Sequence, residues 1–193
     1  MKKKGVVYLA EELIELHGRI LACTLCKLSE SRRKAVPGEG ALNASLMLVG
    51  EAPGRNEDLE GRPFVGAAGG FLNDLLSSIG IDRKDVFITN IVKCRPTANR
   101  PPRVNEVKTC RPYLEGQIRL INPKLVCLMG NHAINGILGK GYPVSEMHGK
   151  QVQTVDRRFF ITYHPAAALY MNNLKETMTE DFKALSKILK QAG

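Results

Sequence analysis

The stretch "SLMLVGEAPGRNEDLEGRPFVGAAGGFL" at residues 45–72 decides the fold class. It opens with an apolar run, 45–50, which is typical of a buried strand, and it closes on a helical pattern that starts near Gly69. Between them lies a Gly- and Pro-rich loop that carries acids and one aromatic residue, Phe64. A buried strand that leads through a long loop into a helix is the unit from which parallel sheets are built.

The same alternation continues along the chain. Strands are predicted at 45–50, 85–92, 125–130, 150–155 and 157–164, and helices at 9–22, 69–79, 104–121, 131–139 and 174–192. Strands separated by helices predict an α/β protein, a three-layer α/β/α sandwich around a mainly parallel sheet. At 193 residues we expect one domain, 1–193, without internal repeats.

The charge balance is strongly basic, with a formal net charge of +9. Basic residues gather at 32–34 and again between Lys93 and Arg111. They indicate either a solvated surface or a surface that binds phosphates. Their position beside cysteines and prolines favours phosphate binding. Arg95 and Arg100 are the predicted DNA-binding residues of this cluster. No apolar run is long enough to span a bilayer, and acids interrupt the N-terminal apolar stretch, so we expect a cytoplasmic protein.

Polar residues follow the predicted strands at their carboxyl ends, where parallel sheets bind ligands. Glu51, Asn90 and His164 stand at three such ends, and Phe64 lies in the loop after the first. Each alone has a structural interpretation: Phe64 as a core contact, Glu51 and Asn90 as capping groups. Together they favour a pocket for a flat, polar ring attached to a polyanion. The P-loop and dinucleotide fingerprints are absent.

The chain contains five cysteines. Cys127 lies inside an apolar strand and is interpreted as a small buried hydrophobe. The other four favour a four-thiolate metal site over unrelated thiols, and their spacing leaves zinc and a [4Fe–4S] cluster both open; they are Cys23, Cys26, Cys94 and Cys110.

From about Leu21 to the C-terminus, the chain resembles the family 4 uracil-DNA glycosylases. The resemblance is carried by "GEAPGRNEDLEGRPFVGAAGGFL", "TNIVKCRP" followed by "NRPP", "HPAAAL" and the four interleaved cysteines. It implies a central four-stranded parallel sheet and a [4Fe–4S] cluster on Cys23, Cys26, Cys94 and Cys110. It also implies a DNA repair enzyme that flips uracil out of DNA and hydrolyses its glycosidic bond.

The resemblance assigns roles residue by residue. Glu51 lies near the sugar and the attacking water, and His164 approaches O2 of the base. Phe64 stacks on uracil, and Asn90 reads its pairing edge. Leu169 and its neighbours probe the duplex, with Tyr170 standing where many relatives have a basic residue.

Two further expectations concern selectivity and product. Thymine must be excluded by its methyl group, for which Ala52 and Pro53 are candidates. The motifs contain no lysine placed as a nucleophile, so we expect an abasic product without strand cleavage. The other histidines, including His132, are expected to be structural.

The expected partner is uracil-containing DNA, single- or double-stranded, bound by a monomer; contact with a sliding clamp is left open. Two other functions remain as alternatives. One is a non-catalytic nucleic-acid-binding module, which would not need Glu51, Asn90 and His164 together. The other is a glycosylase for a different damaged base.

Overall fold

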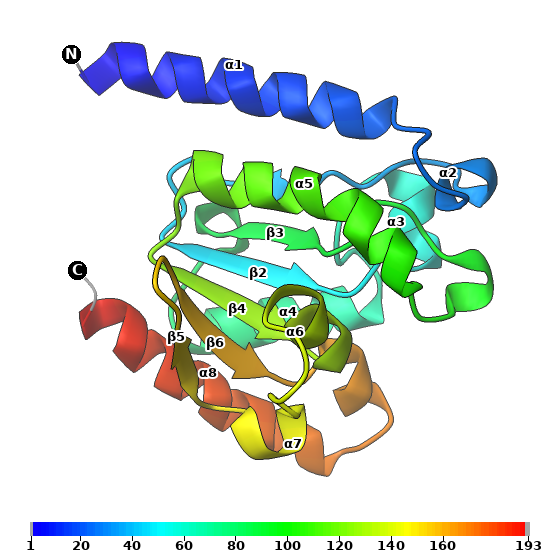
Figure 1. The fold of residues 1–193 in the computed structure, drawn as a ribbon. Coiled ribbons are helices and arrows are strands. Elements are labelled where there is room, and N and C mark those ends of the chain that lie inside the picture. The colour runs from blue at the N-terminus through cyan, green and yellow to red at the C-terminus, as the bar shows by residue number, and fades with distance from the viewer. Residues whose placement is uncertain (1, 192–193) are drawn as a thin grey trace.

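The computed structural model describes residues 2–191, with side-chain surroundings from Tyr8 onward. Its six strands form one sheet in the order β1-β3-β2-β4-β6-β5 (Figure 1). The four inner strands are parallel: β3 (Phe87–Asn90), β2 (Leu46–Gly50), β4 (Leu125–Met129) and β6 (Arg158–Thr162). The α/β class is confirmed. The sheet, however, has six strands rather than four, because short antiparallel strands extend both edges: β1 (Glu39–Gly40) and β5 (Gln151–Gln153).

Helices cover both faces of the sheet, as Figure 1 shows. On one face lie α5 (Val104–Ile121) and α6 (Asn131–Ile137), with α1 (Lys2–Leu21) packed across α5. On the other lie α4 (Ala67–Ser78) and α8 (Asn173–Gln191). The predicted helix 174–192 is therefore present, although Ala192 lies outside the described residues. In the part of the chain described, no helix is long and apolar enough to cross a membrane.

The shorter elements are less regular. They are α2 (Leu28–Ser31), α3 (Arg55–Glu60), α7 (Val144–Met147) and three 3-10 turns, η1 (Arg83–Asp85), η2 (Thr97–Asn99) and η3 (Pro165–Leu169). The sequence pattern predicted a loop where α3 forms, because six residues carry too few apolar positions to show a helical period. Tertiary contacts, described below, stabilise α3 instead.

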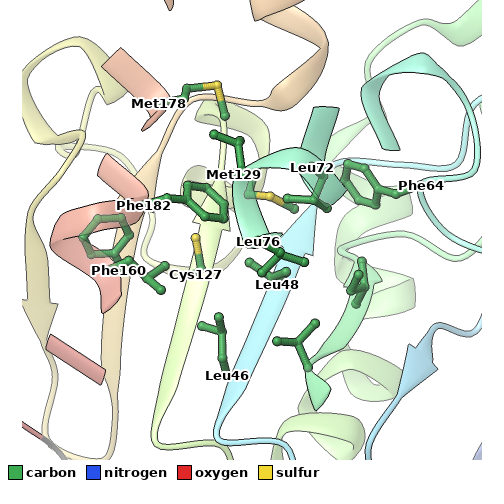
Figure 2. Packing of buried hydrophobic residues seen from close by; sticks show 14 of the residues in the cluster. Leu46, Leu48, Phe64, Leu72, Leu76, Cys127, Met129, Phe160, Met178 and Phe182 are labelled. Atoms are coloured by element: carbon green, nitrogen blue, oxygen red, sulfur yellow. The ribbon is translucent and has the colours of Figure 1, made fainter. Parts of the chain in front are cut away.

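The sheet separates two hydrophobic clusters. Leu46 and Leu48 of β2 face α4 and α8, whereas Met47 and Val49 face the side of α5. This alternation follows from the period of two in a strand, and it leaves β2 and β4 buried on both sides. Figure 2 shows the first cluster, with Phe64 beside Leu72 of α4. One residue of the predicted site is thus anchored directly in the core.

Parallel pairing brings the carboxyl ends of the four inner strands to one edge. Gly50 of β2 pairs with Asn90 of β3, and Met129 of β4 pairs with Thr162 of β6. The segments that leave these ends are 51–54, 91–96, 130–132 and 163–165. Glu51, Ala52 and His164 lie in these segments and Asn90 is the last residue of β3, so the topology alone brings these four residues together.

Candidate active site

A cavity of about 350 Å³ opens at this edge. Its walls contain eight of the residues predicted from sequence: Glu51, Ala52, Pro53, Phe64, Asn90, Arg100, His164 and Tyr170. Arg95 and Leu169 are outside the wall. Pockets of this size hold small organic ligands, so the cavity has room for a pyrimidine ring.

Asn90 is 1% exposed, and its side-chain oxygen has no hydrogen-bond partner within the described residues. Leaving such an oxygen without a hydrogen bond costs about 1–3 kcal/mol. We therefore expect a bound ligand to donate a hydrogen bond to Asn90 Oδ1. Gly50 explains how Asn90 fits. A Cβ at Gly50 would lie 2.5 Å from Asn90 Oδ1 and 2.7 Å from Phe64 Cζ. The absence of a side chain at Gly50 therefore lets the amide and the aromatic ring converge.

Phe64 is buried and has a positive φ of 50°. That backbone region is unusual for a bulky side chain and needs support from the surroundings. The ring stacks on the imidazole of His164, with centroids 5.5 Å apart and planes inclined by 29°. The loop-borne aromatic predicted from sequence thus forms one wall of the pocket.

His164 is the residue that precedes η3, and its Nδ1 accepts a hydrogen bond of 3.2 Å from the backbone N–H of Ala166. Burial lowers the pKa of His164 to about 4, against an opposing effect of the Glu57 charge. The ring is therefore neutral near pH 7. Because Nδ1 is an acceptor in a neutral ring, the proton lies on Nε2, which makes Nε2–H available as a donor.

Glu51 follows β2 and lines the same cavity. Burial raises the pKa of Glu51, and the nearby His132 opposes the rise. His132 Nε2 lies 4.0 Å from Glu51 Oε2. His132 was expected to be structural, but it does not cap α6, whose N-cap is Gly130 with no side-chain hydrogen bond. Only the folded sheet brings this histidine near Glu51; nothing in the local sequence indicates it.

Sequence analysis did not single out Glu57, which organises the loop between β2 and α4. Its Oε1 accepts from the backbone N–H groups of Val65 and Gly66 at 2.9 and 3.0 Å. Its Oε2 accepts from Gly54 N–H at 3.1 Å, at the start of α3. One carboxylate thereby joins both ends of the loop. The sequence feature that could have identified Glu57 is its position three residues after Gly54, because an acid at that position commonly bonds the N–H of the N-cap residue.

The basic residues at the rim are partly engaged by the protein itself. Arg100 forms a bidentate pair with Glu106, at 2.9 and 2.7 Å. Arg95 Nε donates to Asn99 Oδ1 at 2.8 Å, and Asn99 also lines the cavity. At the other side of the rim, Leu169 and Tyr170 are exposed, Tyr170 to 89%. The rim thus combines fixed guanidinium groups with an exposed apolar and aromatic segment.

A second, smaller cavity is lined by the four predicted cysteines: Cys23, Cys26, Cys94 and Cys110. The remaining wall combines apolar side chains, among them Ile20 and Val92, with the basic residues Arg32 and Lys93. Ala52, in the wall of the first cavity, packs against this cysteine cluster. Cys127 is buried in β4, away from them, as expected.

Cationic groups surround the thiols. Arg32 donates to Cys94 Sγ at 3.0 Å and to the Leu21 carbonyl, so one member of the 32–34 basic cluster points inward rather than toward a phosphate track. Burial raises the pKa of Cys110 to about 11, and the neighbouring Lys93 opposes the rise. Across the described residues, no three His, Cys, Asp or Glu side chains are grouped tightly enough to hold a single metal ion.

Comparison with known proteins agrees with this arrangement. The model of the Uracil DNA glycosylase superfamily matches residues 37–190, which defines the class of protein. A type-4 uracil-DNA glycosylase of Sulfurisphaera tokodaii is 44% identical over 92% of this chain and 85% of its own length. One of Archaeoglobus fulgidus is 41% identical over 92% and 94%, and one of Thermotoga maritima 38% over 97% and 100%. The chain belongs to the type-4 uracil-DNA glycosylase family.

Proposed function

We propose that this protein excises uracil from DNA by hydrolysing its N-glycosidic bond, and that it acts as one glycosylase domain over residues 1–193. The observation that carries the proposal is the buried, unpartnered Oδ1 of Asn90 in the same cavity as Phe64 and His164. The family supports the reaction, because its curated members are uracil-DNA glycosylases.

The base is recognised by the Asn90 amide and the Phe64 ring. Asn90 Oδ1 accepts from N3–H of an everted uracil while the amide N–H donates to O4. Cytosine lacks N3–H and presents a donor instead of O4, so it would leave the buried amide unpaired, which discriminates strongly. The Phe64 ring provides a stacking face, as aromatic side chains do for unstacked bases. Ala52 and Pro53, which line the same cavity, are the candidates for contact with a thymine methyl group.

Bond cleavage develops negative charge on the departing base and positive charge on the sugar. His164 Nε2–H donates to O2 of the leaving uracil, and a preorganised donor of this kind typically contributes about 10²–10³-fold in rate. The Glu51 carboxylate stabilises the sugar cation or orients the water. No lysine is present in the cavity wall formed by the described residues, which supports simple hydrolysis to an abasic site.

DNA binding is assigned to the rim. Extruding a base costs a few kcal/mol, less at a mismatch, and an inserted apolar side chain offsets that cost. Leu169 and Tyr170 are exposed and suited to this insertion, while Arg95 and Arg100 contact the phosphates. Single- and double-stranded uracil-DNA are both expected substrates of a monomer acting on cellular DNA in the cytoplasm. A sliding-clamp contact is left open.

We also assign a [4Fe–4S] cluster to Cys23, Cys26, Cys94 and Cys110. The four thiols line one cavity, and four Cys thiolates are the ligand set of a [4Fe–4S] cluster. Zinc accepts the same four thiolates, so the choice of the cluster rests on the resemblance to the type-4 glycosylases. When bound, the cluster crosslinks the segment after α1 to the segments after β3 and in α5.

The experiment uses purified protein and an oligonucleotide with one uracil. We expect strand breaks only after alkali, and free uracil among the products. His164→Ala should slow release by about 10²–10³-fold while retaining DNA binding. Binding without release by the wild type would favour the non-catalytic module, and direct nicking would contradict simple hydrolysis. The same assay is run on oligonucleotides with other damaged bases. Release of one of these bases in preference to uracil would show a glycosylase for that base instead.

A further inference from the structure

The main chain at Phe64 is held in an unfavourable conformation. Its positive φ is unusual for an aromatic residue, and such a conformation persists only when neighbouring groups fix the backbone on several sides. Gly69 gives one sign of how closely the loop is held: a Cβ there would lie 1.8 Å from the Phe64 carbonyl oxygen. The question is which group fixes the peptide at Phe64.

Arg83 contacts this peptide directly. Its Nη1 donates to the Phe64 carbonyl at 3.2 Å, and its Nη2 donates to the Pro63 carbonyl. Nη1 also donates to Asn73 Oδ1 at 3.0 Å. Nε and Nη2 donate to Glu39 Oε1 at 3.2 and 3.0 Å. All three nitrogens are engaged, and the side chain is only 21% exposed.

The backbone around Phe64 is therefore held by a cation and by an anion. The cation binds carbonyl groups, and the anion binds N–H groups. A guanidinium holds the carbonyls of Pro63 and Phe64, and the Glu57 carboxylate holds the N–H groups of Val65 and Gly66. A lysine could not replace Arg83, because only the planar fork offers several donors in fixed directions.

We propose that Arg83, which lies on η1 outside the pocket, is a positioning residue that holds the Phe64 ring in place for base stacking. This inference rests on the proposed function. The competing explanation is that Arg83 only ties η1 to β1 through Glu39. Arg62 distinguishes the two explanations, because it also pairs with Glu39, at 2.8 Å, but within the described residues it donates no hydrogen bond to the Phe64 carbonyl.

The first test is a double-mutant cycle on uracil release. Arg83→Met should lower kcat/KM about tenfold in the wild type and by less than about twofold in a Phe64→Ala background, because the group it acts through is gone. Equal losses in both backgrounds would overturn the proposal. Arg62→Met is the matched control and should leave kcat/KM unchanged.

Arg83→Lys provides a second variant if Arg83→Met does not fold. It keeps a cation beside Glu39 but cannot reach both carbonyls, so kcat/KM should remain reduced. Full activity of Arg83→Lys would show that only charge pairing matters and would contradict a positioning role.

The second test does not depend on activity. The chain has six phenylalanines, so 4-fluorophenylalanine gives a fluorine spectrum in which Phe64→Leu identifies the Phe64 signal. Arg83→Met should shift or broaden that signal and leave the others, and Arg62→Met should change none. An unmoved Phe64 signal overturns the proposal. If the wild type releases no uracil, the proposed function fails while this readout still tests Arg83.

Discussion

The ring of Phe64 stacks on the imidazole of His164, with centroids 5.5 Å apart. One residue comes from the loop before α4 and the other from the end of β6, a hundred positions later in the chain. The proposed stacking face and the proposed donor to the leaving group are therefore one packed unit. Changes at either ring should affect both base binding and chemistry.

Removing the His164 donor should lower kcat by about 10²–10³-fold, the usual effect of losing a preorganised donor to developing charge. His164→Gln should recover part of the rate, because an amide N–H can replace Nε2–H, whereas His164→Ala should not. Single-turnover uracil release measures both. Equal rates for the wild type and His164→Ala would remove His164 from catalysis.

The pH dependence of kcat/KM should report Glu51 rather than His164. Burial raises the pKa of Glu51 above its usual value, whereas His164 titrates at about 4. As pH falls, the carboxylate is protonated first, so activity declines while His164 is still neutral. Glu51→Gln should have a low rate and keep only the decline near pH 4. An unchanged acidic limb in Glu51→Gln would contradict this assignment.

Asn90→Asp should reduce discrimination between uracil and cytosine. A protonated carboxyl group can donate to N3 of cytosine and accept from its amino group, which the amide cannot do in the same orientation. We expect a fall of about 10²-fold or more on uracil together with detectable release of cytosine. Selectivity is measured with matched oligonucleotides. Unaltered selectivity would mean that Asn90 does not read the base.

Gly50→Ala should damage the pocket and leave the fold intact. Its Cβ would lie 2.5 Å from Asn90 Oδ1 and 2.7 Å from Phe64 Cζ, so one of these groups must move. We expect kcat/KM to fall about tenfold or more. Gly70→Ala is the control: that position in α4 is open and exposed, so alanine should preserve activity and add roughly 0.5–1 kcal/mol of stability.

Anaerobically purified protein should contain about four irons and absorb visible light at about 400 nm. Cys94→Ala should lose the absorption and the iron, because one of four ligands is missing. Cys127→Ala, which alters a cysteine buried in β4, should keep both while losing some stability. Stoichiometric zinc without iron would contradict the assignment, as would a Cys94→Ala protein with undiminished absorption.

The sequence predicted the parallel sheet and much of the pocket wall because both depend on local signals. Continuous apolar runs marked β2 and β4, and Asn90 and His164 stood at strand ends that parallel pairing must bring together. The edge strand Glu39–Gly40 was missed because two residues carry no alternating pattern.

Residues that act through tertiary contacts were not predictable in the same way. Arg83 lies nineteen positions from the Phe64 carbonyl it contacts, and His132 reaches Glu51 only across the sheet edge. Arg32 looked like a phosphate ligand, but in the structure it donates to Cys94. The charge and type of a residue do not indicate which group its side chain will contact. That is decided by how segments distant in the sequence pack together.

The central claim is that Asn90 accepts N3–H of an everted uracil in the pocket formed with Phe64 and His164. Single-turnover release from oligonucleotides that differ only at the target base tests it most directly. Uracil should be released, whereas N3-methyluracil, which has no N3–H, should stay bound to the DNA, as should thymine and cytosine. Release of N3-methyluracil at the rate of uracil would contradict the account.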